Sequence, residues 1–106
     1  MMEIKTKTKE KAGLIEVSGE LDIATIKDFE VEVERLWGLV DIIDIDFAGV
    51  EFIDSTGLQA LVYSIMKTKG KNIGIKIFNI SREIYDVLEI LGIPELLGKD
   101  ILTTDH

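Results

Sequence analysis

The sequence predicts an α/β fold with a single open mixed sheet, in which an N-terminal hairpin precedes parallel βαβ units and the helices lie mainly on one face. Two observations carry this prediction. The hydrophobic spacing switches between periods of two and 3.6, in the order strand, strand, helix, strand, helix, strand, helix. The strands also alternate apolar with polar residues, as expected when helices cover only one face. Because βαβ crossovers are right-handed, strands added in sequence order place every helix on that face.

Four segments have the alternation of strands, and they are residues 2–9, 14–18, 42–52 and 73–77. The first two flank a predicted turn at residues 10–13, so they form a β-hairpin. The third segment places Ile43, Ile45 and Phe47 on one side and Asp44 and Asp46 on the other. We expect this acidic side of the sheet to face water.

Three segments have helical spacing, and their apolar stripes are Ile26, Phe29, Val33, Leu36 and Trp37, then Leu58, Leu61, Val62 and Ile65, then Ile84, Val87, Leu88 and Leu91. The first helix ends at Gly38, and Thr25 with Asp28 forms a predicted capping box at its start. The second begins at Thr56 and stops near Gly70, and the third has Ser81 as its N-cap. Residues 95–106 are expected to add a short helical turn and an extended piece.

The length, the net charge and the lack of cysteine exclude several classes of partner and cofactor. The 106 residues suffice for a single domain spanning residues 1–106, and 46% of them are hydrophobic. The net charge of −8 argues against nucleic acid and anionic membrane as partners, because both require clustered cations. The chain has no cysteine and its only histidine is His106, so we expect neither metal nor cofactor. A protein partner with a basic face is favoured.

No apolar run approaches the roughly 18 residues of a membrane span, and the first residues lack the apolar stretch of a secretory signal. We therefore expect a cytoplasmic protein. In parallel βαβ units, the loops that leave the carboxyl ends of the strands gather at one edge of the sheet. Here these loops are residues 20–24, 54–57 and 79–82, and their edge is the predicted functional surface.

The segment Asp54-Ser55-Thr56-Gly57-Leu58 follows an apolar strand and opens an amphipathic helix. It places a hydroxyl at a helix N-terminus, where free N–H groups and the macrodipole would stabilise a phosphate on Ser55. Thr56 and Gln59 match a capping box, which would leave Ser55 just outside the helix with its hydroxyl free. Alternatively, Ser55 is itself the cap and its hydroxyl is occupied.

The neighbours of Ser55 each have two or more interpretations. Asp54 could cap the helix, support the loop or touch a partner. Gly57 could ease the turn or allow close approach by a kinase. Asp22, from the preceding loop, is either a helix-start signal or part of the partner surface. The same residues therefore fit both a structural and a functional reading.

Residues 50–58 (Val-Glu-Phe-Ile-Asp-Ser-Thr-Gly-Leu) and 17–22 (Val-Ser-Gly-Glu-Leu-Asp) resemble the STAS domain of bacterial anti-sigma factor antagonists, over nearly the whole chain in element order. The resemblance implies that an ATP-using anti-sigma factor kinase phosphorylates Ser55. It further implies that the unphosphorylated form binds this anti-sigma factor and frees the sigma factor, while a PP2C-type phosphatase resets the switch. The implied partner-binding residues are Asp22, Asp54, Ser55, Thr56 and Gly57.

Three other classes stay open. A receiver domain would use Asp54 as phosphate acceptor, but such a domain does not open with a hairpin, and the first strand here lacks a closing acidic pair. An independent enzyme would need a glycine-rich phosphate loop, a histidine base or a metal cluster, none of which the sequence offers, so we expect no enzymatic activity. A STAS-type scaffold would bind a partner or small ligand without phosphorylation, with Ser55 only a cap.

Overall fold

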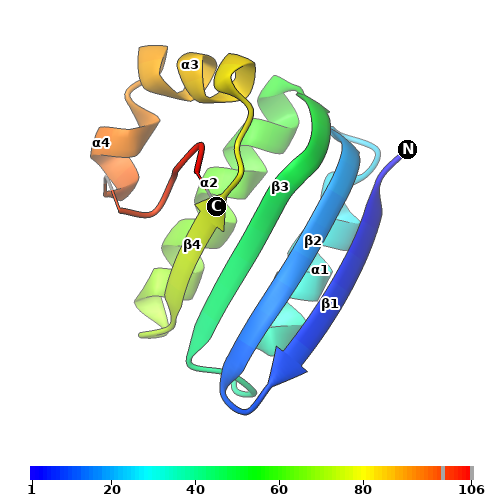
Figure 1. The fold of residues 1–106 in the computed structure, drawn as a ribbon, viewed down its shortest axis with the longest axis vertical. Helices are drawn as coiled ribbons and strands as arrows, with labels where there is room; N and C mark the ends of the chain where they lie inside the picture. The colour runs from blue at the N-terminus through cyan, green and yellow to red at the C-terminus, as the bar shows by residue number, and fades with distance from the viewer. Residues whose placement is uncertain (99, 106) are drawn as a thin grey trace.

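The computed structural model describes residues 1–98 and 100–105. In this part of the chain four strands and four helices follow one another (Figure 1). The strands are β1 (Glu3–Lys9), β2 (Ala12–Leu21), β3 (Ile42–Ile53) and β4 (Gly74–Phe78). The helices are α1 (Ile26–Leu36), α2 (Ser55–Gly70), α3 (Arg82–Ile90) and α4 (Ile93–Leu97). The predicted elements are thus confirmed, with ends that shift by a few residues.

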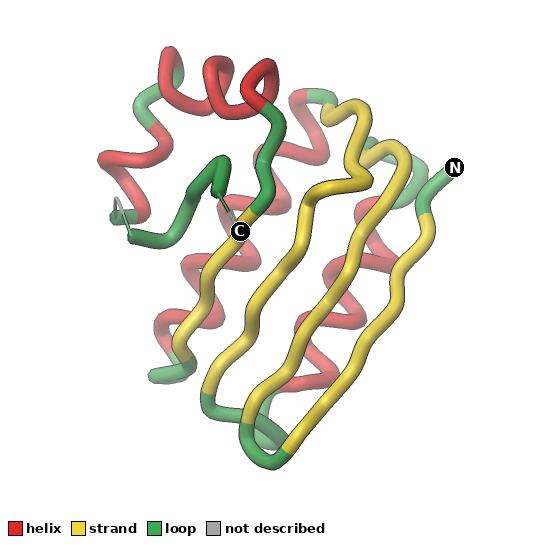
Figure 2. Tube along the Cα trace, viewed as in Figure 1, coloured by secondary structure: helices red, strands yellow, loops and turns green. Residues whose placement is uncertain are grey.

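The sheet has the strand order β1-β2-β3-β4, so each strand pairs with the next in sequence. The β1–β2 pair is antiparallel, and the β2–β3 and β3–β4 pairs are parallel. Helices α1 and α2 lie behind the sheet on one face, and α3 and α4 lie beyond its β4 side (Figures 1 and 2). The predicted fold class, an open mixed sheet with helices mainly on one face, is confirmed.

The core lies between the sheet and the two helices on its covered face. The strands contribute Ile15, Val17, Ile43, Ile45, Phe47, Ile75 and Ile77, and the helices contribute Phe29, Val33, Leu36, Leu61 and Ile65. Each of these residues is at most 8% exposed. Their spacing follows the two-residue and 3.6-residue periods from which the elements were predicted.

The predicted apolar stripe of α3 is wrong in part. Ile84 and Leu88 are buried, whereas Val87 and Leu91 are 49% and 56% exposed. The helix lies beside the sheet instead of across it (Figure 1), so only a narrow face meets the core. Its predicted N-cap is confirmed, since Ser81 Oγ accepts a hydrogen bond from Ile84 N at 3.2 Å.

The capping box predicted at the start of α1 is also wrong. Thr25 occupies the N-cap position, but its side chain does not cap the helix. The Thr25 hydroxyl instead accepts from Asp22 N at 3.0 Å and donates to Glu20 O at 2.7 Å. The Thr25 hydroxyl is thus directed toward the preceding loop and accepts from no N–H group of the first turn of α1.

The C-terminal segment returns along the free edge of β4. Ile77 N donates to Ile101 O at 2.7 Å, and Thr103 N donates to Ile77 O at 3.0 Å. Leu102 between them is only 2% exposed. The predicted extended piece is therefore present and pairs with the sheet, and α4 supplies the predicted helical turn. His106 lies outside the described residues.

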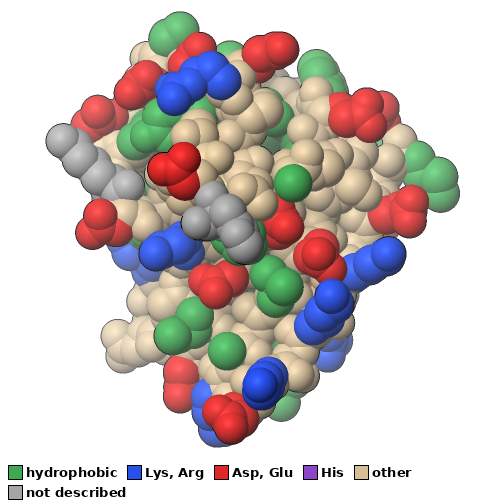
Figure 3. Space-filling view, in the orientation of Figure 1, with side chains coloured by type: hydrophobic (Ala, Val, Ile, Leu, Met, Phe, Trp, Pro, Cys, Tyr) green, Lys and Arg blue, Asp and Glu red, His purple; other side chains and the backbone are tan. Residues whose placement is uncertain are grey.

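The face of the sheet opposite α1 and α2 is open and carries both red acidic and blue basic side chains (Figure 3). Asp44 and Asp46 are half-buried on β3. Asp46 Oδ1 accepts from Ala48 N at 2.9 Å and from Asn79 Nδ2 at 3.1 Å. The acidic side thus lies on the face of the sheet away from α1 and α2, but both side chains are only partly open to the water that was expected there, and Asp46 also holds the chain that follows β4. Among the described residues, no helix is long and apolar enough to cross a membrane.

Candidate functional site

Strands β2 and β3 extend past β4 and end together. The last β3–β4 pair is Asp46 with Phe78, whereas the β2–β3 pairing continues to Leu21 with Ile53. The register shifts twice along β2, as in a β-bulge, before it reaches that end. We call the residues at this end, 20–24 and 51–57, the β2–β3 corner. It holds all five residues that the resemblance assigns to partner binding.

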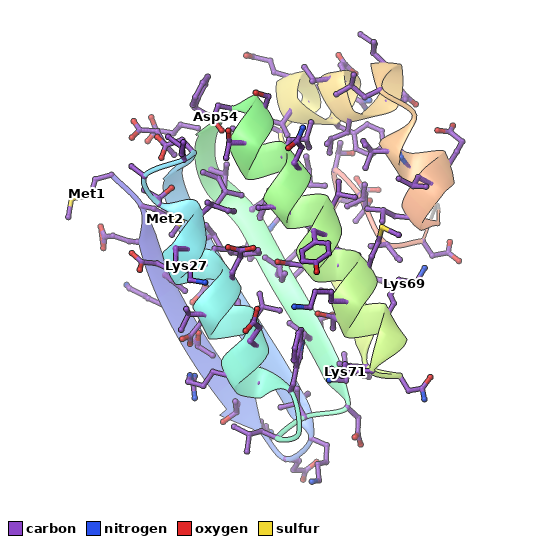
Figure 4. All side chains as sticks on the ribbon, turned by 180° about the vertical axis from the view of Figure 1, so that it is seen from behind. Met1, Met2, Lys27, Asp54, Lys69 and Lys71 are labelled. Atoms are coloured by element: carbon purple, nitrogen blue, oxygen red, sulfur yellow. The ribbon has the colours of Figure 1, made fainter. Side chains whose placement is uncertain are left out.

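Asp54 joins the two loops of the corner. Its Oδ1 accepts from Gly57 N at 2.7 Å in the first turn of α2, and its Oδ2 accepts from Ile23 N at 3.3 Å in the loop before α1. Its own N–H donates to Leu21 O at 3.2 Å. Figure 4 shows Asp54 where β3 ends and α2 begins. One carboxylate therefore fixes the position of the loop relative to the helix.

The N-cap of α2 is Asp54, so the predicted Thr56–Gln59 capping box is wrong. An aspartate is favoured at this position because its oxygen accepts from the first turn and its charge meets the positive end of the macrodipole. The helix consequently begins at Ser55, one residue earlier than predicted. Thr56 is exposed in the first turn.

Ser55 is exposed at the first position of α2. Within residues 1–98 and 100–105 its hydroxyl makes no hydrogen bond. The alternative in which Ser55 is the cap is therefore wrong, and the hydroxyl is available because Asp54 does the capping. The hydroxyl is thus accessible from solvent and is engaged in no hydrogen bond of the fold that the described residues form.

Gly57 is buried against the loop that precedes α1. A Cβ at this position would lie 2.2 Å from Leu21 O and 2.8 Å from Leu21 C, which is too close for any side chain. Glycine is therefore required here by the packing of α2 against the end of β2. This reason is additional to the two predicted ones, the turn and the approach of a kinase. The close approach of α2 to β2 depends on this glycine.

Asp22 holds the loop between β2 and α1. Its Oδ1 accepts from Ala24 N at 3.0 Å and from Thr25 N at 3.2 Å, and the residue is half-buried. This geometry is that of a helix-start signal, one of its two predicted roles. Asp22 therefore shapes the same surface that it would offer to a partner.

The corner is acidic. The Met1 ammonium lies at the same end of the sheet (Figure 4), and its pKa is raised, first by a hydrogen bond to Glu20 and then by the charges of Glu20, Asp22 and Glu51. These carboxylates lie near one another, with Asp54 at the start of the adjacent helix. Such a surface complements a basic partner and disfavours an additional negative charge.

Two large apolar side chains of the corner were missed by sequence reasoning. Ile23 is 75% exposed and Phe52 is 52% exposed. Phe52 lies opposite Glu20 in the β2–β3 pairing. The sequence did contain a signal for Ile23. It is an isoleucine in the otherwise polar loop of residues 22–25, and it belongs to neither a strand nor a helix pattern.

The third predicted loop, residues 79–82, does not bond to the corner. Asn79 Nδ2 reaches Asp46, and within the described residues no hydrogen bond joins residues 79–82 to residues 20–24 or 54–57. The reason is that β4 stops opposite Asp46, well before β3 ends. All three loops leave the carboxyl ends of parallel strands, as predicted, but only residues 20–24 and 54–57 are joined by hydrogen bonds.

A groove of about 970 Å³ lies away from the corner, between β4, α3 and the C-terminal segment. Its walls include Lys76, Tyr85 and Thr103, and no corner residue lines it. Within residues 1–98 and 100–105, no group of three or more Asp, Glu or His side chains is placed to hold a metal ion. The groove is therefore separate from the corner.

Residues 3–105 match the family model of the STAS domain. The chain belongs to the STAS domain family. An anti-sigma-B factor antagonist from Staphylococcus aureus (strain NCTC 8325 / PS 47) is 30% identical over 98 residues, which are 91% of this chain and 90% of that protein. The resemblance stated from residues 17–22 and 50–58 is thereby confirmed.

Three solved structures share this STAS fold. An anti-sigma factor antagonist from Mycobacterium paratuberculosis has a TM-score of 0.80 and 20% identity, covering 97% of this chain and 86% of that one. The Bacillus cell fate determinant SpoIIAA in its phosphorylated form has a TM-score of 0.72 and 16% identity, covering 94% and 88%. The murine anion transporter Slc26a9 has a TM-score of 0.76 and 19% identity, covering 91% and 16%. At such identities these neighbours show the fold alone.

Proposed function

We propose that this STAS protein is an anti-sigma factor antagonist controlled by phosphorylation at Ser55. Its unphosphorylated form binds an anti-sigma factor kinase and so releases the sigma factor, and phosphorylated Ser55 blocks that binding. The observation that carries the proposal is the exposed, unbonded Ser55 hydroxyl at the start of α2, on an acidic corner. The Staphylococcus aureus relative, named an antagonist, supports it across 91% of the chain.

The helix that follows Ser55 would tolerate a phosphate. Gly57 N and Leu58 N are bonded to Asp54, whereas the N–H groups of Ser55 and Thr56 have no partner within the described residues. These two donors and the positive end of the 16-residue helix would stabilise the added anion. The phosphorylated SpoIIAA structure, which shares the fold, supports this tolerance.

A partner docked on the corner would not tolerate a phosphate on Ser55. Phosphorylation adds about −1.5 to −2 charge, beside Asp54 and the corner carboxylates Glu20, Asp22 and Glu51. Removed from water by a partner, this dianion would cost desolvation energy and repel any acidic group opposite. A loss of about 3 kcal/mol weakens binding by about two orders of magnitude. The modification therefore ejects the partner without unfolding the domain.

In this proposal the protein is a substrate and a binding module, not an enzyme, and it needs no cofactor of its own. The kinase activity belongs to the anti-sigma factor, which uses ATP, and a PP2C-type phosphatase removes the phosphate. The cycle takes place in the cytoplasm and involves neither nucleic acid nor membrane as a direct partner of this chain.

Phosphorylation is tested by incubating the protein with its cognate anti-sigma factor kinase and Mg-ATP, followed by intact-mass measurement and peptide mapping. We expect one phosphate on Ser55, absent from Ser55→Ala and retained in Thr56→Ala. The second variant is a matched control, because Thr56 is the neighbouring exposed hydroxyl. Phosphate on Thr56, or none while the kinase modifies another antagonist, contradicts the proposal.

Binding of the phosphorylated form provides the second half of the test. We expect its affinity for the anti-sigma factor to fall at least a hundredfold, with unchanged amide spectra in α1 and α2. A global spectral change contradicts the claim that the fold is kept. If the phosphorylated form and Ser55→Asp both bind as well as the parent, the alternative of a scaffold without a phosphorylation switch is correct.

A further inference from the structure

Ile23 is an exposed apolar residue held in a fixed position. Its side chain is 75% exposed, yet its backbone N–H is bonded to Asp54 Oδ2 at 3.3 Å. The residues on either side are also restrained, since Asp22 Oδ1 accepts from Ala24 N at 3.0 Å. A flexible loop could turn such a side chain inward, but this loop is hydrogen-bonded at both ends of the turn.

The surroundings of Ile23 indicate what could cover it. Carboxylates of Glu20, Asp22 and Glu51 lie around the same corner, and Ser55 begins the adjacent helix. Apolar centres with a charged rim are typical of protein interfaces. The complementary surface has an apolar pocket bordered by arginine or lysine side chains, which matches the basic face expected from the net charge of −8.

We propose that Ile23 is the apolar anchor by which the corner docks the anti-sigma factor, and that Asp54 is the positioning residue that presents it. This inference rests on the proposed function and names the contact that function needs. The partner's matching surface is an apolar pocket with a basic rim. Asp54 contributes through the loop geometry that its Oδ2 maintains, in addition to capping α2 through Oδ1.

The anchor is tested by measuring the affinity of Ile23→Ala for the cognate anti-sigma factor. Ile90→Ala is a matched control, because Ile90 is 84% exposed on α3 and loses the same atoms without a change in charge. We expect at least a tenfold loss of affinity for Ile23→Ala and less than a twofold change for Ile90→Ala. Thermal unfolding midpoints should match the parent for both, since neither side chain is buried.

The positioning role is tested by a double-mutant cycle between Asp54→Asn and Ile23→Ala. The two bonds use different oxygens of Asp54, and asparagine replaces one of these oxygens by an NH2 group that cannot accept, so one of the two bonds is lost. If Asp54 acts through Ile23, Asp54→Asn weakens binding at least fivefold in the parent and less than twofold in Ile23→Ala. A role in helix stability alone would give the same loss in both backgrounds and would overturn the positioning role.

The outcomes separate the anchor from the function on which it rests. If the parent binds the anti-sigma factor and Ile23→Ala binds within twofold of it, the anchor is wrong and the proposed function stands. If the parent does not bind at all, the proposed function is wrong and the anchor falls with it. Selective loss in Ile23→Ala, together with coupling to Asp54, supports both parts of the inference.

Discussion

Gly57 lies where the two halves of the corner are in close contact. Its Cα faces the carbonyl of Leu21, so that α2 begins directly against the end of β2. Asp54 reinforces this contact through its bond with Leu21 O and its cap on Gly57 N. The position of Ser55 relative to the neighbouring loop thus depends on a residue that has no side chain.

Replacing Gly57 by alanine should separate α2 from β2. The added Cβ meets backbone atoms, which cannot rotate away, so we expect a loss of about 1–3 kcal/mol in the free energy of unfolding. Partner binding should fall with it, because the loop that carries Ile23 must move. Denaturant unfolding and affinity measurements check both expectations.

Gly70→Ala is the control for this substitution. Gly70 ends the same helix, and a Cβ there would meet nothing within 4 Å. We expect it to be neutral or to stabilise the protein by up to about 1 kcal/mol, since alanine is the better helix former. Equal stability of Gly57→Ala and the parent would show that α2 can shift at no cost.

At the scale of elements, α1 is tied to the sheet through Glu32. Its carboxylate accepts from Arg35 Nη2 at 2.8 Å and from Arg35 Nε at 3.2 Å, and it also accepts from the Thr6 hydroxyl of β1. These bonds, first that of Arg35 and then that of Thr6, lower the pKa of Glu32 below its ordinary value. The edge strand β1 is thereby linked to the helix that covers it.

This link should make stability depend on pH. A carboxylate whose pKa is lowered by folding adds stability above its unfolded pKa of about 4.3, and the gain disappears as the pH falls through the folded pKa. We expect Glu32→Gln to lose up to about 1 kcal/mol at pH 7, with a smaller difference from the parent in acid. Urea unfolding of Glu32→Gln and the parent measures this difference in the free energy of unfolding. The range from about pH 3 to about pH 7 includes the unfolded pKa of roughly 4.3.

Glu10→Gln serves as the comparison, because Glu10 is exposed in the β1–β2 turn and has no ion pair within the described residues. Its difference from the parent should stay within about 0.5 kcal/mol at every pH. A Glu32→Gln difference that is independent of pH would contradict the ionic link and would leave only a packing effect.

At the scale of the whole molecule, the C-terminal segment, residues 101–103, covers the free edge of the sheet along β4. Its pairing with Ile77 covers backbone groups of β4 that would otherwise be open to pairing with another chain. Leu97 of α4 and Leu102 of this segment are each 2% exposed, so the C-terminal part of the chain also adds to the core. A chain of this size depends on every such contribution.

Leu102→Ala should therefore destabilise the domain by about 2–5 kcal/mol, as expected for a buried leucine. Leu96→Ala is the control, since Leu96 is 61% exposed on α4 and should change stability by less than about 0.5 kcal/mol. Chemical unfolding measures both. Equal stability of the two variants would mean that the segment is not part of the cooperative fold.

Much of the fold could be predicted because periodicity is a local property. The alternation in β3 and β4 and the stripes of α1 and α2 depend on residues a few positions apart. Contacts between distant segments have no such signature. The approach of Gly57 to Leu21, the bond from Ile23 to Asp54 and the pairing of Leu102 with Ile77 were therefore not foreseen.

By itself, the sequence determined the strand and helix order, the covered face of the sheet and the placement of Asp54 and Ser55 between β3 and α2. Hydrophobic burial and chain connectivity are enough to decide these features. Only the tertiary structure decided that Asp54 is the cap, that Ser55 is thereby left free, and that Ile23 is held outward beside it. Each depends on how two loops, separated along the chain, share one set of hydrogen-bond donors and acceptors.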